Sequence, residues 1–242
     1  QVQSMCQQFC VNFQMALNPQ LTKSYAKGDI ISMHSLLIKS SKFSFYILYI
    51  IAVPLMFEAN LVLKLWLGIV PEHTVSFLRL ILVVGLLYTL SNPILTSVHA
   101  TGKLKKFQII EGTMLLMIVP IVYLLLKVFG IAPEFVFVVH IIVETCTQYA
   151  RVRIVLPMIQ MKLRTYLREV ILPIIKVAII SPILPYLLYK NIEQSIASFF
   201  AICSLCVVCI FATVFYVGCK KSEQDFLISK IYSIYKKCTG KI

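Results

Sequence analysis

Charged side chains are scarce in this sequence, and acidic ones are the scarcest. Asp, Glu, Lys and Arg make up 14% of the 242 residues, against about 25% in soluble domains. Apolar residues make up 59%, above the roughly 45–50% of soluble domains. This balance excludes an ordinary soluble domain and predicts an integral membrane protein.

The sequence also lacks the patterns that carry chemistry in enzymes. It contains no nucleophile–base constellation, no phosphate-binding loop and no convincing metal site, so we expect neither an enzyme nor a cofactor. Cys203, Cys206 and Cys209 share one helical face within an apolar run, which favours small packing residues over zinc ligands. Residues 1–20 lack the basic start and the uninterrupted apolar centre of a signal peptide, so we expect none there. The chain begins at Gln1 inside a predicted helix, which suggests a piece of a longer protein.

Long apolar runs dominate the rest of the chain. Most of them approach the roughly 20 residues that a helix needs to cross a bilayer. Hydropathy predicts six spans, at residues 43–57, 76–98, 107–129, 133–149, 169–189 and 194–217. Residues 2–17 form a seventh, amphipathic candidate. The predicted fold class is therefore all-α, a polytopic transmembrane helix bundle of about seven spans.

The basic residues predict the orientation of this bundle. Eighteen of the 23 lie in segments on one side of the membrane, at 18–42, 99–106, 150–168 and 218–242. Lys64, Lys127, Lys190 and the nearby Arg79 lie toward the other side. A positive bias marks the cytoplasmic face, so we expect the N-terminus outside and the C-terminus inside. Topology thus accounts for the positive charge, and no nucleic-acid partner is expected.

Ionisable side chains within the spans are the strongest functional signal, because a charge at the bilayer centre costs about 2.5–3.5 kcal/mol. Glu111 lies about 8 Å beyond Lys106 along a helix and could pair locally with the lysines of that connection. Glu144 and Lys176 lie at similar depths in adjacent spans. They either form a buried pair, or Lys176 extends to the inner surface.

Two predicted helices carry polar stripes. One face of the fourth apolar run holds His140, Glu144, Gln148 and Arg151. One face of the first segment holds Gln3, Gln7, Gln14 and Asn18. A polar stripe on an apolar span normally faces the bundle interior or a water-filled cavity. Amides provide the donors and acceptors that sugar hydroxyls need, although interhelical hydrogen bonds are the alternative.

Arg79 lies near the outer end of its span, where it either binds a phosphate or anchors the helix at the interface. Arg79 joins the candidate substrate-binding residues taken from the intramembrane charges and from the amide stripe, the face of the first segment that holds Gln3, Gln7, Gln14 and Asn18. The set is Arg79, His140, Glu144, Lys176, Gln7 and Gln14.

Three stretches of the chain resemble a known family. They read "NPQLTKSYAKGD", "SSKFSFYILYIIAVPLMFEANLVLKLWLGIVPEHT" and "SVHATGKLKKFQIIEG". They are similar to bacterial polysaccharide flippases, which move O-antigen or capsule repeat units and belong to the multidrug/oligosaccharidyl-lipid/polysaccharide exporter superfamily. The resemblance covers residues 1–160 well and the last two spans mainly in topology.

Members of that family have two lobes of helices around a central cavity. By this comparison, residues 1–160 are part of the C-terminal lobe, and residues 161–218 are an additional transmembrane hairpin. Residues 219–242 would be a basic amphipathic cytoplasmic tail lying on anionic lipids, with an ordinary cytoplasmic tail as the alternative. The N-terminal lobe of the same protein would be missing and would be a partner of this chain.

The activity implied by the resemblance is translocation of an undecaprenyl-pyrophosphate-linked oligosaccharide across the cell inner membrane, by alternating access between the two lobes. A drug exporter of the same superfamily is one alternative, and we expect it to have an acidic cavity for cations. A membrane glycosyltransferase or polymerase is another, although it would need a sizeable outer loop. The longest outer connection, at residues 58–75, is short for that role.

Overall fold

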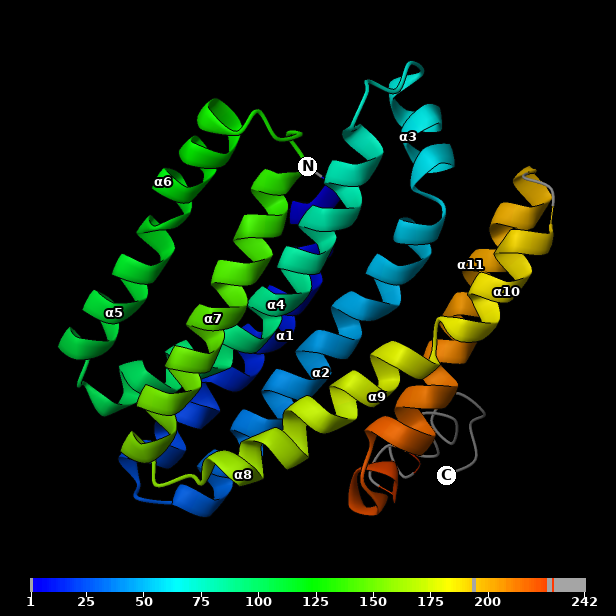
Figure 1. Ribbon diagram of the computed structural model, residues 1–242. Helices are drawn as coiled ribbons and strands as arrows, with labels where there is room; N and C mark the ends of the chain where they lie inside the picture. Colours follow the sequence, from blue (N-terminus) through cyan, green and yellow to red (C-terminus); the bar gives the residue numbers. More distant parts are fainter. Residues whose placement is uncertain (1, 193–194, 226–227, 229–242) are drawn as a thin grey trace. The chain divides into compact units, whose positions relative to one another are not determined.

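The computed structural model in Figure 1 describes residues 2–192, 195–225 and 228. All regular structure in these ranges is helical, as the composition predicts. Most of the predicted amphipathic tail, at 226–227 and 229–242, lies outside the described residues.

The chain divides into two compact units, Gln1–Ile171 and Leu172–Ile242. The first unit contains α1 (Val2–Ala26), α2 (Ile30–Phe57), α3 (Ala59–Leu67), α4 (Thr74–Thr101), α5 (Lys105–Leu116), α6 (Ile118–Tyr123), the π-helical turn η1 (Leu124–Val128), α7 (Phe135–Met158), α8 (Leu163–Tyr166) and the π-helical turn η2 (Leu167–Ile171). The second contains α9 (Leu172–Ile180), α10 (Ile183–Asn191), α11 (Ile196–Thr213) and the π-helical turn η3 (Val214–Gly218).

Six helical segments in the described chain are long and apolar enough to cross a membrane. They are Ile30–Phe57, Thr74–Thr101, Lys105–Val128, Phe135–Met158, Leu163–Asn191 and Ala197–Gly218. The prediction of an all-helical chain with several helices suited to cross a membrane is therefore confirmed for the described residues. The seventh span would be α1, whose 25 residues are long enough but less apolar than the others. Its place as a span, and the orientation of the bundle, stay predictions.

Several helices extend beyond the apolar runs that revealed them. Helix α2 begins at Ile30, well before the run at residue 43, because Asp29 caps it by accepting a hydrogen bond from the backbone N–H of Ser32 at 3.0 Å. Helix α7 continues to Met158, past the predicted end of its span at residue 149. This second extension keeps Arg151 within a helix, although the sequence analysis assigned it to a loop.

Helix α4 is the centre of the first unit. It packs against α1, α2 and α7, and α5 packs against the outer side of α7 (Figure 1). Gly85 permits a close approach of α1, since a Cβ at this position would lie 3.3 Å from Nε2 of Gln7. Small residues serve this purpose where membrane helices cross. The apolar core along α4 includes Leu82 and Ile94, which are fully or almost fully buried.

The second unit is a smaller helical assembly. Helix α9 ends at Ile180, and α10 begins at Ile183 after a two-residue turn at Ser181 and Pro182. Helix α11 packs against α10. Ser195 starts α11 through a capping box, in which its hydroxyl accepts from the Ser198 backbone N–H. On α11, Cys206 is fully buried, in keeping with the packing role predicted for the cysteine face.

Candidate functional site

A buried arginine organises the polar interior of the first unit. Arg151 of α7 is 3% exposed. Its Nε donates to Oε1 of Glu111 at 2.6 Å, and its Nη1 donates to Oε1 of Glu144 at 2.5 Å. The same Nη1 donates to Oγ of Ser91 at 2.6 Å and to Oε1 of Gln148 at 3.2 Å. One guanidinium thus joins α4, α5 and α7 inside the helix bundle.

The local spacing of α7 places three members of this cluster together. Glu144, Gln148 and Arg151 follow one another at helical intervals, and all three are buried, with Glu144 0% exposed. Ser91 of α4 completes the network, because its hydroxyl lies 3.1 Å from Oε1 of Glu144 and 2.8 Å from Oε1 of Gln148. The polar stripe predicted for this helix therefore faces the bundle interior.

The structure gives the two intramembrane glutamates one partner that the sequence analysis did not name. Glu111 binds Arg151, forty residues along the chain, and not the lysines of the neighbouring connection. Glu144 also has Arg151 as its partner. The reason is the length of α7. The sequence assigned Arg151 to a cytoplasmic loop, whereas the helix continues for two more turns and keeps this residue inside the bundle.

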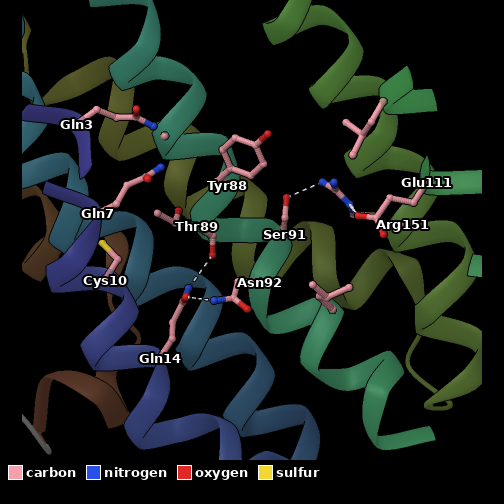
Figure 2. A pocket seen from close by; sticks show the side chains of 13 residues that line it. Gln3, Gln7, Cys10, Gln14, Tyr88, Thr89, Ser91, Asn92, Glu111 and Arg151 are labelled. Atoms are coloured by element: carbon pink, nitrogen blue, oxygen red, sulfur yellow. Dashed lines mark hydrogen bonds and ion pairs between the residues drawn. The ribbon is translucent and has the colours of Figure 1, made fainter. Parts of the chain in front are cut away.

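A polar cavity of about 490 Å³ opens beside the arginine (Figure 2). Helix α1 contributes the side chains of Gln3 and Gln7 to its lining. Helix α4 contributes Tyr88 and Asn92. Glu111 and Arg151 form the wall on the side of α5 and α7, and Figure 2 shows their bond together with the bond from Arg151 to Ser91.

The amide side chains of α1 have two different roles: Gln14 bonds to a neighbouring helix, and Gln3 and Gln7 line the cavity. Gln14 is 2% exposed, donates to the carbonyl oxygen of Thr89 at 3.1 Å and accepts from Nδ2 of Asn92 at 2.5 Å. It therefore joins α1 to α4, which is the interhelical alternative to sugar binding. Gln3 and Gln7 are half-buried in the cavity lining, and neither has a hydrogen-bond partner among the residues described. Their amides remain available to a ligand.

The other predicted site residues lie outside the cavity lining. Nε2 of His140 is 3.2 Å from the hydroxyl of Tyr88, so His140 orients a residue of the lining. Arg79 is exposed and donates from Nε to the carbonyl oxygen of Met56 at 2.8 Å, which links the start of α4 to the end of α2. Lys176 is exposed on α9, in the second unit.

The sequence analysis missed the polar residues that α4 contributes. Ser91 and Asn92 lie three and four residues after Tyr88 within an apolar run. This spacing places them on one helical face, and a polar face on an apolar span is the same signal that singled out α7. The α4 stripe was the available indication of the cavity.

A second side-chain contact joins two connections at one end of the unit. Nδ1 of His73, in the connection before α4, contacts Oε1 of Glu134, in the connection before α7. The rings of Phe77 and Phe137 follow on these two helices, with their centroids 5.4 Å apart. A backbone hydrogen bond at Glu134 and a hydrogen bond from the His73 ring lower the pKa of the Glu134 carboxyl.

This lowered pKa predicts a stability change in acid. The ordinary pKa of a glutamate is about 4.3. A carboxyl with a lower pKa in the folded state stabilises the fold fully above that ordinary value, and this contribution is lost as the pH falls through the lowered pKa. We expect the thermal midpoint in lipid nanodiscs to fall over this acid range. Glu134→Gln should remove that part of the fall.

The matched control for this experiment is Glu72→Gln, which removes an exposed carboxylate from the connection that carries His73. We expect it to follow the wild-type pH profile. A Glu134→Gln protein with the wild-type profile would show that this contact contributes nothing to stability.

No protein-family model matches the chain, and no curated protein or solved structure is significantly similar to it.

Proposed function

We propose that this protein moves an undecaprenyl-pyrophosphate-linked oligosaccharide across the bacterial inner membrane, as the C-terminal lobe of a two-lobe transporter. The observation that carries the proposal is the polar cavity with Arg151 in its wall, within a bundle of helices long and apolar enough to span a membrane. Its volume of about 490 Å³ falls within the roughly 300–1,000 Å³ of typical ligand sites.

The cavity has chemistry for both parts of such a cargo. The amides of Gln3, Gln7 and Asn92 provide donors and acceptors for sugar hydroxyls, and Tyr88 provides a hydroxyl and a ring. A guanidinium matches the geometry of phosphate oxygens, and it is the side chain best suited to binding phosphate inside a protein. Arg151 therefore takes the phosphate-binding role that the sequence analysis considered for Arg79.

The proposed topology counts α1 as a seventh span. Its 25 residues correspond to about 38 Å of helix, and it packs against α2 and α4. With the basic segments on the cytoplasmic side, the N-terminus lies outside and the C-terminus inside. Anionic lipids at the basic tail and an N-terminal lobe facing the cavity are the partners that this arrangement requires.

A second candidate function has a specific observation in its favour. Two carboxylates, those of Glu111 and Glu144, share the single guanidinium of Arg151. When all three groups are ionised, the cluster carries one excess negative charge. An acidic cavity is what we expect of a drug exporter that carries organic cations, so export of an amphipathic cation is the alternative.

Deleting the intact gene distinguishes the two functions. In cells with no other flippase for the same polysaccharide, we expect the lipid-linked repeat unit to accumulate in the inner leaflet and the surface polysaccharide to disappear. Returning the gene on a plasmid should restore the polysaccharide. Persistence of the surface polysaccharide would contradict the proposal, and a gain in sensitivity to cationic drugs with normal polysaccharide would support the exporter.

A further inference from the structure

One edge of the Arg151 guanidinium is only half used. Nη1 serves three acceptors, on Glu144, Ser91 and Gln148. The opposite edge presents parallel N–H groups from Nε and Nη2, and Glu111 accepts from Nε alone. Nη2 has no hydrogen-bond partner in the part of the chain that the structure describes. This edge belongs to a residue that lines the cavity.

The two carboxylates on Arg151 are held very differently. Glu144 is 0% exposed, lies on the same helix as Arg151 and also receives the hydroxyl of Ser91. Glu111 keeps 13% of its side chain exposed, lines the cavity and makes a single bond. It is carried by α5, where Phe107 is the one buried residue. Glu144 is therefore a permanent partner of the arginine, whereas Glu111 is held loosely enough to leave.

We propose that Glu111 is a displaceable resident anion, and that a diphosphate group entering the cavity takes its place on Arg151. A phosphate can accept from Nε and Nη2 together, and such paired, charge-assisted bonds are stronger than the single bond to Glu111. Glu144 keeps Nη1 in place during the exchange. The identity of the diphosphate as that of a lipid carrier rests on the proposed function, but the exchange of anions on Arg151 does not.

The exchange has two physical consequences. In the empty cavity Glu111 accepts from Nε, so this N–H group of the buried guanidinium is not left without a hydrogen-bond acceptor. In the loaded cavity its competition lowers the apparent affinity, because only the fraction of protein with a free edge can bind. Displacement also breaks the bond that joins α5 to α7, so occupancy of the cavity changes how this outer helix is held.

The test is calorimetric binding of inorganic pyrophosphate to the whole chain in nanodiscs of neutral lipid. Glu111→Gln keeps the shape of the side chain but removes its charge, and we expect binding at least about tenfold tighter than wild type, equivalent to about 1.4 kcal/mol. Glu72→Gln makes the same change in net charge at an exposed position and should keep the wild-type affinity. Arg151→Lys keeps a cation beside both carboxylates but lacks the two-donor edge, and it should lose binding.

Three results would overturn the exchange. They are equal affinity of Glu111→Gln and wild type, an equal gain in Glu72→Gln, and unchanged binding in Arg151→Lys. A second titration uses a polyprenyl diphosphate in place of pyrophosphate. If pyrophosphate follows the expected order while the polyprenyl diphosphate does not bind, the exchange stands and the lipid-linked cargo of the proposed function is contradicted.

Discussion

Arg151→Met is expected to destabilise the protein by about 3–5 kcal/mol, the loss measured when one partner of a buried ion pair is removed. The substitution leaves the carboxylates of Glu111 and Glu144 without their cation, and Glu144 is 0% exposed. It also removes a donor from Ser91 and Gln148. The measurement is the free energy of unfolding in mixed micelles of denaturing and mild detergent.

Further substitutions test whether the loss of stability in Arg151→Met comes from the unpaired carboxylates. Adding Glu111→Gln and Glu144→Gln to Arg151→Met removes all three charges, and we expect most of the lost stability to return. Arg153→Met is the control on the same helix, because Arg153 is exposed and lies over the ring of Tyr149 in a cation–π arrangement. If the triple variant lost as much unfolding free energy as the three single substitutions together, the three charged residues would not be energetically coupled.

Phe107→Ala is the second substitution with a large expected effect. Phe107 is 0% exposed and is the single buried residue of α5. It lies where α5 meets α7, next to Ala150 and Ile154. Replacing a buried phenylalanine with alanine costs about 3–5 kcal/mol, and we expect the lower end, because lipid can take over part of the apolar contact that is lost.

The loss should be local to α5, which is otherwise held mainly by the bond between Glu111 and Arg151 one turn further along. We expect faster amide hydrogen exchange across α5 in Phe107→Ala, along with the lower unfolding free energy. Ile109→Ala, at a position 59% exposed on the same helix, is the matched control and should leave both measurements unchanged. Wild-type exchange in Phe107→Ala would show that α5 has another anchor.

Structural features that depend only on residues close together in the sequence could be predicted from it. Long apolar runs predicted membrane-spanning helices, because a bilayer requires an uninterrupted apolar stretch of a certain length. The intervals between Glu144, Gln148 and Arg151 predicted a shared face, because the period of a helix is the same in every fold. That a polar stripe lies inside the bundle also followed, since a charge facing lipid is costly.

The ion pairs were decided by the tertiary structure alone. Hydropathy shows where apolar residues stop but not where a helix stops, so Arg151 was assigned to a loop although α7 carries it inside the bundle. The bond from Arg151 to Glu111 then depends on the packing of α5 against α7, across a connection whose geometry the sequence does not reveal. The sequence by itself determined a multi-pass helical membrane protein with polar faces. Only the packing of the helices decided which faces meet, because each buried charge takes the partner that lies nearest in space.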